Sequence, residues 1–359
     1  MKILVTGVCG QLGHDVVNEL SKRNETESKN FVCIGSDITP QYNGVADGSA
    51  VTKAAYVSLD ITDAAAVEKA IIDNDVDAVI HCAAWTAVDL AEDDDKKEKV
   101  KMVNTVGTQN LVNAVKKLDA QKATGCKFMY ISTDYVFDGQ GTTPWNPDCK
   151  DYAPLNVYGQ TKLGGELAVS ENLEKYFIVR IAWVFGRNGK NFIKTMLRVG
   201  KSHDKLTVVC DQIGTPTYTY DLAVLLCDMV ETEKYGYYHA TNAEVTKAGT
   251  AATSEESAAL IADADAKTAE GCKAGYISWY DFTKEIFRQA VLAGHAEYSE
   301  DNISVKPVTT EEYGVSKAAR PFNSRLDKSK LVENGFAPLP SWQDAVKRYI
   351  AELDFDALD

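Results

Sequence analysis

The sequence predicts an α/β protein built on a doubly wound parallel sheet, and two observations carry that prediction. Short apolar runs alternate with amphipathic helical patterns through the first half of the chain. This rhythm is typical of βαβ units, in which helices cover both faces of the sheet. A glycine-rich turn, Gly7 to Gly13, joins the first apolar run to the first helical pattern, which is a place where such sheets bind phosphates.

The expected elements alternate regularly up to Gly186. Strands are expected at 2–6, 31–35, 77–83, 127–132 and 176–184, and helices at 10–23, 63–74, 103–118 and 158–171. The alternation weakens afterwards, with helices expected at 192–200, 220–231, 278–294 and 341–353 and strands at 205–211 and 236–242. A stretch rich in Ala, Thr, Asp and Glu, at about 244–273, is interpreted as an insertion, and its capping-box pattern predicts a peripheral helix over about 254–269.

Composition limits the function. The chain has 359 residues, enough for one large domain or two ordinary ones, and its formal net charge of -14 argues against a general binder of nucleic acid or anionic membrane. The eight cysteines contain no Cys-x-x-Cys pair, which predicts reduced thiols and a cytoplasmic protein. The five histidines show no metal-ligand spacing, so no metal site is expected. The opening MKILVTG is too short an apolar run for a signal peptide or a membrane span.

The turn after the first strand has the spacing G-x-x-G-x-x-G, formed by Gly7, Gly10 and Gly13, with Gln11 and Leu12 between the last two. Glycines permit the tight turn and the close approach of the backbone to a pyrophosphate, while the helix N-terminus supplies free N–H groups and a positive dipole end. The context therefore predicts a dinucleotide site in a Rossmann-type domain. It also supplies a local positive field within an acidic protein.

Residues after the next strands are placed to complete that site. Asp37 ends the second strand, where an acid accepts hydrogen bonds from the adenosine ribose and disfavours a 2′-phosphate, so the sequence favours NADH. Asp60 and Ile61 lie just before the helix expected at 63–74, after a further strand that is counted as the third, and are expected to flank adenine. Ala83 and Ala84 follow the fourth strand and are small enough to let the backbone approach a cofactor.

Three polar residues indicate the chemistry. Tyr158 and Lys162 are four residues apart in a predicted helix and therefore share one face, where a cation favours ionisation of the phenol. Thr133 ends the fifth strand, and the C-terminal ends of parallel strands are where such sheets bind ligands. A hydroxyl, a tyrosine and a lysine at that edge form a coherent reductase site.

Together these motifs resemble those of the extended short-chain dehydrogenase/reductases. Within that superfamily the chain is similar to the dTDP-4-dehydrorhamnose reductase family over nearly its whole length, except for the insertion at 244–273 and a lengthened segment at about 38–57. The resemblance rests on HCAAWTAVDLAE (81–92), YISTDYVFDG (130–139), PLNVYGQTKLGGE (154–166), RIAWVFG (180–186), DQIGTPTYTYDLA (211–223) and RPFNSRLD (320–327).

The resemblance implies reduction of the C4 ketone of a nucleotide-linked 6-deoxy sugar, dTDP-4-dehydro-L-rhamnose, with NADH or NADPH as cofactor. It implies that Tyr158 is the general acid, that Lys162 lowers the pKa of that phenol and holds the nicotinamide ribose, and that Thr133 orients the carbonyl. It implies substrate contacts for Thr133, Asp134, Trp183, Gln212 and Thr217. It places Gly214 and Pro216 near the nucleotide. It implies that Arg180 orders the cleft and that Arg320, Asn323 and Ser324 line it.

We divide the chain into an NAD(P)-binding domain, 1–183 plus about 218–242, and a substrate-binding domain, about 184–217 and 243–359. Trp85 departs from the family pattern, and its bulk near the cofactor is expected to influence the choice between NADH and NADPH. A small nucleotide-sugar substrate and a homodimer are the partners considered, and no motif for the magnesium site of some relatives is present in the sequence.

Two alternatives stay open. Nucleotide-sugar dehydratases and epimerases share Tyr-x-x-x-Lys, but a dehydratase has Thr-Asp-Glu at the fifth strand end because eliminating water needs an acid and a base. Here Tyr135 takes the third position, which favours reduction. A non-catalytic regulatory subunit of methionine adenosyltransferase keeps the fold and the cofactor, but intact Thr133, Tyr158 and Lys162 give little reason to choose it.

Overall fold

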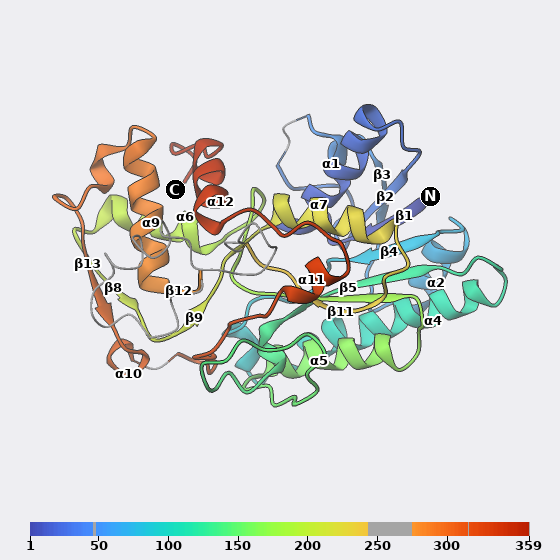
Figure 1. The fold of residues 1–359 in the computed structure, drawn as a ribbon. Coiled ribbons are helices and arrows are strands. Elements are labelled where there is room, and N and C mark those ends of the chain that lie inside the picture. Colours follow the sequence, from blue (N-terminus) through green and yellow to red (C-terminus); the bar gives the residue numbers. More distant parts are fainter. Residues whose placement is uncertain (46–47, 243–274, 315, 359) are drawn as a thin grey trace.

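A computed structural model describes residues 1–45, 48–242, 275–314 and 316–358 (Figure 1). Its centre is a seven-stranded sheet in the order β11-β6-β5-β4-β1-β2-β3, and every neighbouring pair is parallel. The strands are β1 (Lys2–Thr6), β2 (Val32–Asp37), β3 (Ala55–Ser58), β4 (Ala78–His81), β5 (Lys127–Thr133), β6 (Tyr176–Ile181) and β11 (Gly236–His239). This confirms the predicted doubly wound fold.

The order of the strands sets where a ligand binds. The chain starts at β1, moves outward through β2 and β3, and then returns to β4 on the other side of β1 before moving outward again. The strand order therefore reverses between β1 and β4, and the crevice at the C-terminal ends of these strands is the usual ligand site of an open α/β sheet.

Helices cover both faces of the sheet (Figure 1). One face carries α1 (Gln11–Thr26) and α7 (Thr219–Val230), and the other carries α2 (Ala64–Ile72), α4 (Gly107–Asp119) and α5 (Val157–Ser170). Successive side chains of a strand point to opposite faces, so Ile3 and Val5 join one core while Leu4 joins the other. Both faces are apolar because both are buried.

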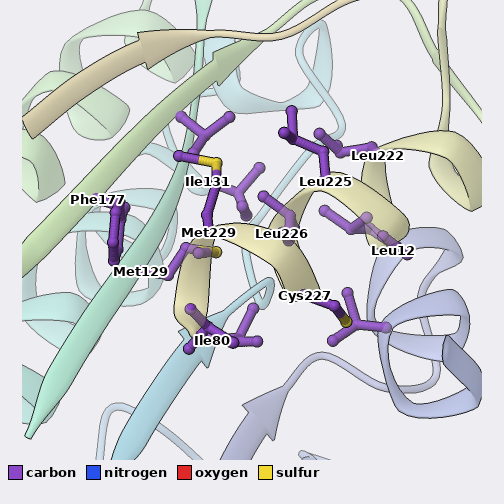
Figure 2. Close-up of a cluster of buried hydrophobic side chains, with 14 of the residues drawn as sticks. Leu12, Ile80, Met129, Ile131, Phe177, Leu222, Leu225, Leu226, Cys227 and Met229 are labelled. Atoms are coloured by element: carbon purple, nitrogen blue, oxygen red, sulfur yellow. The ribbon is translucent and has the colours of Figure 1, made fainter. Parts of the chain in front are cut away.

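The core on the α1 and α7 face is shown in Figure 2. Leu222, Leu225 and Leu226 of α7 lie over Ile80 of β4 and Met129 of β5. Full burial of a leucine side chain contributes about 1.5–3 kcal/mol, so this layer holds the helices against the strands that lead to the crevice.

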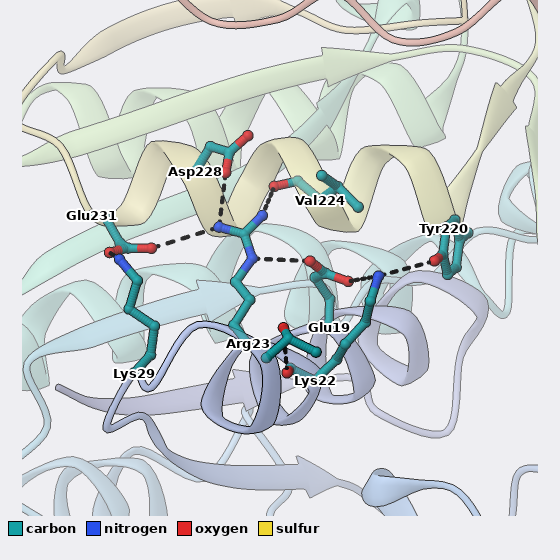
Figure 3. Close-up of polar contacts among 9 residues, drawn as sticks. Glu19, Lys22, Arg23, Lys29, Tyr220, Val224, Asp228 and Glu231 are labelled. Carbon is teal, nitrogen blue, oxygen red and sulfur yellow. Dashed lines mark hydrogen bonds and ion pairs between the residues drawn. The ribbon is translucent and has the colours of Figure 1, made fainter.

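A buried arginine adds a polar tie between the same two helices (Figure 3). Arg23 of α1 donates to Glu19 at 2.9 Å, to the carbonyl oxygen of Val224 at 3.0 Å and to Asp228 of α7 at 2.7 Å. Its side chain is only 6% exposed, and these partners satisfy a charge that would otherwise be costly to bury.

The helix expected at 103–118 begins earlier than predicted. It starts as α3 (Lys97–Lys101), passes through a π-helical stretch at Met102–Val106 and continues as α4. The π turn brings Asn104 to the interior, where it is 1% exposed. π-Helical turns occur often at functional sites. Here the turn lets Asn104 bind Trp85, after β4, and Thr161 of α5.

The remainder of the chain forms a smaller α/β region to the left of the sheet in Figure 1. Its own core is made of apolar side chains from helices that come before residue 243 and after residue 274 in the sequence. Its elements are β7 (Val184–Phe185), α6 (Phe192–Ser202), β8 (Lys205–Val209), β9 (Ile213–Gly214), β10 (Thr217–Tyr218), β12 (Ile277–Ser278), α9 (Trp279–Leu292), β13 (Ser304–Val308), α10 (Thr310–Tyr313) and α12 (Trp342–Ala351). The short helix α11 (Ser329–Glu333) instead packs beside β11 of the large sheet, and its Leu331 joins the core there.

One predicted strand is wrong in its extent, and one predicted helix lies in a part of the chain that the structure does not describe. The run expected as one strand at 176–184 is split, because β6 ends at Ile181 and β7 pairs with β10 in a separate small sheet. The helix predicted over about 254–269 lies outside the described residues. Within the described ranges, no helix combines the length and the apolar character needed to cross a membrane.

Candidate active site

The glycine-rich turn is shaped by close backbone approaches. Gly7 has a φ of +74°, and its N–H donates to the carbonyl oxygen of Ser36 at 2.8 Å. A Cβ added to Gly7 would lie 2.7 Å from the backbone nitrogen of Ala83, and one added to Gly13 would lie 2.3 Å from the carbonyl oxygen of Gly7. Only glycine fits these positions. Gly10 is the N-cap of α1 and has no side chain to cap the first turn of the helix.

Asp37 lies where the sequence predicts it, at the end of β2, and it braces this turn. Its carboxylate accepts the Cys9 N–H at 2.9 Å through one oxygen and the Ile38 N–H at 2.8 Å through the other. Gln11 and Leu12 open α1, with Leu12 buried. The carboxylate of Asp37 therefore lies beside the glycine-rich turn, where the sequence predicts a dinucleotide.

Asp60 and Ile61 follow β3 and differ in exposure. Asp60 is exposed and accepts both the N–H and the hydroxyl of Thr62, at 2.9 and 2.7 Å. Ile61 is 7% exposed and packs on Gly107, where a Cβ would lie 2.7 Å from the isoleucine side chain. Whether the pair flanks adenine stays a prediction.

Asn104 of the π-helical stretch forms hydrogen bonds with the backbone that follows β4. Asn104 accepts the Trp85 N–H at 2.8 Å, donates to the Trp85 carbonyl oxygen at 3.2 Å, and donates to the Thr161 hydroxyl at 3.1 Å. Ala83 donates its N–H to the Thr6 hydroxyl at 3.2 Å, and the adjacent Ala84 is partly exposed. Sequence reasoning missed Asn104, because a π turn leaves no sign in the helical pattern.

Thr133, Tyr158 and Lys162 come together at the C-terminal edge of β5. Thr133 is the last residue of that strand, and the other two lie in the first two turns of α5, which packs beside it. Asn156 caps α5 by accepting the Gly159 N–H at 2.8 Å. The three residues therefore lie on neighbouring elements, and the role of each stays a prediction.

The Tyr158 phenol lies beside the Thr133 hydroxyl and the Asp134 carboxyl group. Its ring packs edge-to-face on Tyr135, with centroids 5.6 Å apart. Burial raises the pKa of Tyr158 above its usual value, and the charge of Asp134 adds to the rise. A general acid near neutral pH needs the opposite shift, so a nearby cation has to provide it.

Lys162 is a buried cation without a carboxylate partner among the described residues. It is 3% exposed, its Nζ donates to the carbonyl oxygen of Ile131 at 2.7 Å, and it lies 4.1 Å from the centroid of the Tyr130 ring. Burial lowers the pKa of Lys162 to about 7. The predicted contact of Lys162 with a ribose would replace or add to its bond with Ile131.

Beneath this edge, Arg180 of β6 is buried and forms a paired fork with Glu166 of α5. Its Nε and Nη2 donate to the two carboxylate oxygens, each at 2.8 Å. A third bond reaches the Tyr152 hydroxyl at 3.1 Å. Arg180 therefore joins β6 to α5, which agrees with an ordering role and leaves no N–H fork free for substrate.

Trp183 joins the two regions of the molecule. It has a φ of +50° and stacks on Trp279, the first residue of α9, with ring centroids 3.8 Å apart. A Cβ on Gly214 would lie 3.0 Å from its indole. Sequence reasoning missed Trp279, whose only signal was an aromatic residue at a helix start.

Two predicted substrate residues are engaged with the protein. Gln212 is 7% exposed and donates to the Thr310 hydroxyl at 3.0 Å. Thr217, which directly follows Pro216, is fully buried and donates its hydroxyl to the carbonyl oxygen of Ala182 at 2.6 Å. Their contact with substrate stays a prediction.

The segment 316–321 binds the loop that follows β4. Asp89 accepts the Ser316 hydroxyl and the Ala318 N–H, both at 3.1 Å, and pairs with Arg320 at 2.7 Å. Asn156, the cap of α5, donates to the carbonyl oxygen of Ala319 at 2.8 Å. The segment therefore ties the smaller region to the start of the helix that carries Tyr158.

Beyond that segment, Asn323 and Ser324 are buried near the end of β5. Asn323 donates to the carbonyl oxygen of Thr143 at 2.9 Å. A cavity of about 770 Å³ lies elsewhere, beside α1 and Arg187, and Tyr158 is not among the residues that line it. Within the described ranges, no group of three or more His, Cys, Asp or Glu side chains is arranged to hold a metal ion.

Known proteins resemble this chain in sequence over most of its length. The chain matches the RmlD substrate binding domain family over residues 1–273 and 263–355. It is 35% identical over 277 residues to the dTDP-4-dehydrorhamnose reductase of Escherichia coli K12, covering 77% of this chain and 80% of that protein. It is 33% identical over 349 residues to the reductase of the same name from Streptomyces griseus, covering 96% and 91%.

Solved structures agree in fold. A dTDP-4-dehydrorhamnose reductase from Clostridium acetobutylicum superposes with a TM-score of 0.74 at 33% identity and covers 98% of each chain. A reductase of the same name from Bacillus anthracis, in complex with NADP, gives a TM-score of 0.74 at 31% identity and covers 98% of this chain and 99% of that one.

Proposed function

The chain belongs to the RmlD substrate binding domain family, and from that premise we propose that it reduces the C4 ketone of dTDP-4-dehydro-L-rhamnose to give dTDP-L-rhamnose. It is an NAD(P)H-dependent oxidoreductase of the extended short-chain dehydrogenase/reductase superfamily. The observation that carries the proposed reaction is the meeting of Thr133, Tyr158 and Lys162 at one edge of the sheet. The glycine-rich turn opens at the same C-terminal edge, beside the end of β4.

The residues around the turn fit a dinucleotide. Gly7, Gly10 and Gly13 leave the space that side chains would fill, and the first turn of α1 offers N–H groups to a pyrophosphate. Bound NAD(P)H supplies the hydride. The protein's own part is to hold the ketone and to donate a proton from Tyr158 to its oxygen, a step that contributes about 10²- to 10⁴-fold to the rate.

The choice between the two cofactors is the finer part of the proposal. Asp37 favours NADH, because its charge at the end of β2 repels a 2′-phosphate. The following residues, 38–45, contain no Lys or Arg to pair with that phosphate. The Bacillus anthracis relative was solved with NADP, so the preference has to be measured on this chain. We expect kcat/KM to be higher with NADH.

The test is the loss of NAD(P)H absorbance with dTDP-4-dehydro-L-rhamnose, for the wild type and for Tyr158→Phe. The proposal expects turnover that falls by at least about a hundredfold in the variant, because the phenylalanine keeps the ring packing on Tyr135 and removes only the proton donor. Asp37→Asn, measured with both cofactors, should narrow the preference for NADH. An equal rate for Tyr158→Phe would reject Tyr158 as the acid.

The remaining parts of the proposal rest on less direct support. The two-domain division is supported by the separate core of the smaller region. A cytoplasmic location is supported by the seven described cysteines, which are all free thiols. No turnover with either cofactor, in protein that binds NAD(P)H, would favour another nucleotide-sugar substrate or a regulatory binder. A homodimer stays a prediction for a sedimentation experiment.

A further inference from the structure

The Thr133 hydroxyl is already committed within the protein. It donates its one hydrogen to Oδ1 of Asp134 at 3.0 Å and accepts the Tyr135 N–H at 3.2 Å. A threonine has a single hydroxyl hydrogen. The Tyr158 phenol also lies within hydrogen-bond reach of this hydroxyl. While this arrangement holds, Thr133 cannot donate a hydrogen bond to a ketone oxygen.

Asp134 is an unusual partner for that hydroxyl. It is 2% exposed, and its second oxygen, Oδ2, is buried without a hydrogen bond to any described residue. No cation in the described ranges forms an ion pair with it. The Ser324 hydroxyl lies close enough to act on this carboxyl group, but an ionised carboxylate remains costly to bury in this position. A protonated carboxyl group would lose less on burial.

The charge of Asp134 also acts on the proposed acid. Asp134 is among the groups that raise the pKa of Tyr158, because a carboxylate disfavours the tyrosinate that forms when the phenol donates its proton. An ionised Asp134 therefore opposes the reduction twice, by holding the Thr133 hydrogen and by repelling the tyrosinate. A neutral Asp134 removes both effects.

We propose that Asp134 is a positioning residue that acts in its protonated form, donating its hydrogen to Oγ1 of Thr133 and so freeing the Thr133 hydrogen for the ketone oxygen. This rests on the proposed reductase function. Asp134 keeps its proton throughout, and only the direction of its hydrogen bond with Thr133 reverses. The proton that reaches the developing alkoxide still comes from Tyr158, and the hydride from the cofactor.

The surroundings agree with a change of protonation state in a physiological range. Burial raises the pKa of Asp134 to about 6, and the hydroxyls of Ser324 and Thr133 limit the rise. The titratable groups that face it are the phenols of Tyr135 and Tyr158, whose pKa values burial raises, so both stay neutral. Lys162 also titrates in this site, near pH 7, and has to be separated from Asp134 by the controls.

The first experiment is the pH dependence of kcat between pH 5 and 8 in the wild type and in Asp134→Asn and Asp134→Ala. The asparagine can donate an N–H to Thr133 as the neutral acid would, so we expect it to lose the inflection near pH 6 and to keep a kcat well above that of the alanine variant. The alanine should lower kcat by about tenfold or more at every pH, with KM for the cofactor unchanged. The inflection due to Lys162 should persist in both variants.

An outcome in which asparagine falls as far as alanine would overturn the proposal, because it would show that the negative charge is what the site needs. An inflection near pH 6 that survives in Asp134→Asn would overturn it as well. Thr133→Val is a second probe that needs no change at Asp134. Its residual kcat should show no inflection near pH 6, because Asp134 acts through the Thr133 hydroxyl.

A measurement without substrate separates this proposal from the reaction itself. The carboxyl stretching band of Asp134, observed by infrared difference spectroscopy in wild-type protein labelled at aspartate, should show protonation with a midpoint near pH 6. If that band titrates while dTDP-4-dehydro-L-rhamnose is not reduced, the proposed substrate is rejected and the proposed protonation of Asp134 is retained. If Asp134 stays ionised down to pH 5 in an enzyme that turns over, the device is wrong and the reaction stands.

Discussion

Two cations lie buried under the same edge of the sheet and are held in opposite ways. Arg180 pairs with both oxygens of Glu166, each at 2.8 Å. Lys162 lies one turn before Glu166 on α5 and, among the residues that the structure describes, binds the carbonyl oxygen of Ile131 and the face of Tyr130. Residues four apart on a helix can pair, so Glu166 was within reach of Lys162 by sequence, yet Arg180 takes it.

The pKa values follow this difference. Burial lowers the pKa of Arg180, but the bonds to Glu166 outweigh burial and the net shift is upward. Burial also lowers the pKa of Lys162, and with no bonded carboxylate the value falls to about 7. The paired cation is suited to holding elements together, and the other remains available for chemistry.

The largest effect is expected from breaking the paired cation. Arg180→Met would leave Glu166 buried without its partner, so we expect the free energy of unfolding to fall by about 3–5 kcal/mol. Denaturant titration of the variant and the wild type measures this difference. The double variant Arg180→Met/Glu166→Leu removes both charges and should recover much of the loss. If the single variant costs less than about 1 kcal/mol, the pair is not an anchor of the fold.

Lys162→Met should behave in the opposite way. The pKa of Lys162 is near 7 in the folded protein and about 10.4 when unfolded. Below pH 7 both states are protonated and the buried charge destabilises the wild type in full. Between pH 7 and 10 the unfolded state binds more protons, so the stability of the wild type rises with pH. We expect the variant to be the more stable at pH 6 by roughly 3–5 kcal/mol, and this gap to close by pH 10.

Turnover supplies the control for that comparison. The folded Lys162→Met protein should lose at least about a hundredfold in kcat, because no cation then favours ionisation of Tyr158. A variant that is less stable than the wild type at pH 6 would show instead that Lys162 supports the fold. Denaturant titrations at pH 6, 8 and 10, each paired with the wild type, decide between the two.

The smallest effect is expected from an exposed pair on the helix before β4. Lys69 and Asp73 of this pair have side chains that are 77% and 55% exposed. Water screens such a pair, so Lys69→Ala should change the free energy of unfolding by less than about 0.5 kcal/mol. If Lys69→Ala lowered the free energy of unfolding by more than about 1.5 kcal/mol, burial would not explain the larger loss expected for Arg180→Met.

Much of the fold could be predicted because its signals are local. The apolar runs and helical patterns correspond to β1, β2, β4, β5 and β6 and the helices between them within a few residues. The glycines of the turn and the Tyr158–Lys162 spacing depend only on neighbours in the chain. Thr133 at the end of β5 follows from the same reasoning.

The partners that are distant in sequence could not be predicted. Trp183 stacks on Trp279 across 96 positions of sequence, and Asp89 binds Arg320 across 231. The strand β13 was not expected, and it pairs with β8 in a sheet of two. Such contacts depend on which of many surfaces meet, and a short pattern carries no information on that choice.

The amino-acid sequence by itself determined the sheet, the dinucleotide turn and the identity of the three polar residues, because periodicity and spacing follow from backbone geometry. Only the tertiary structure decided that Glu166 pairs with Arg180, that Lys162 is left to Ile131, and that the Thr133 hydrogen goes to Asp134. Each of these is a competition between several polar groups for one partner. Its outcome is set by distance and burial in the folded chain, and these exist only after packing.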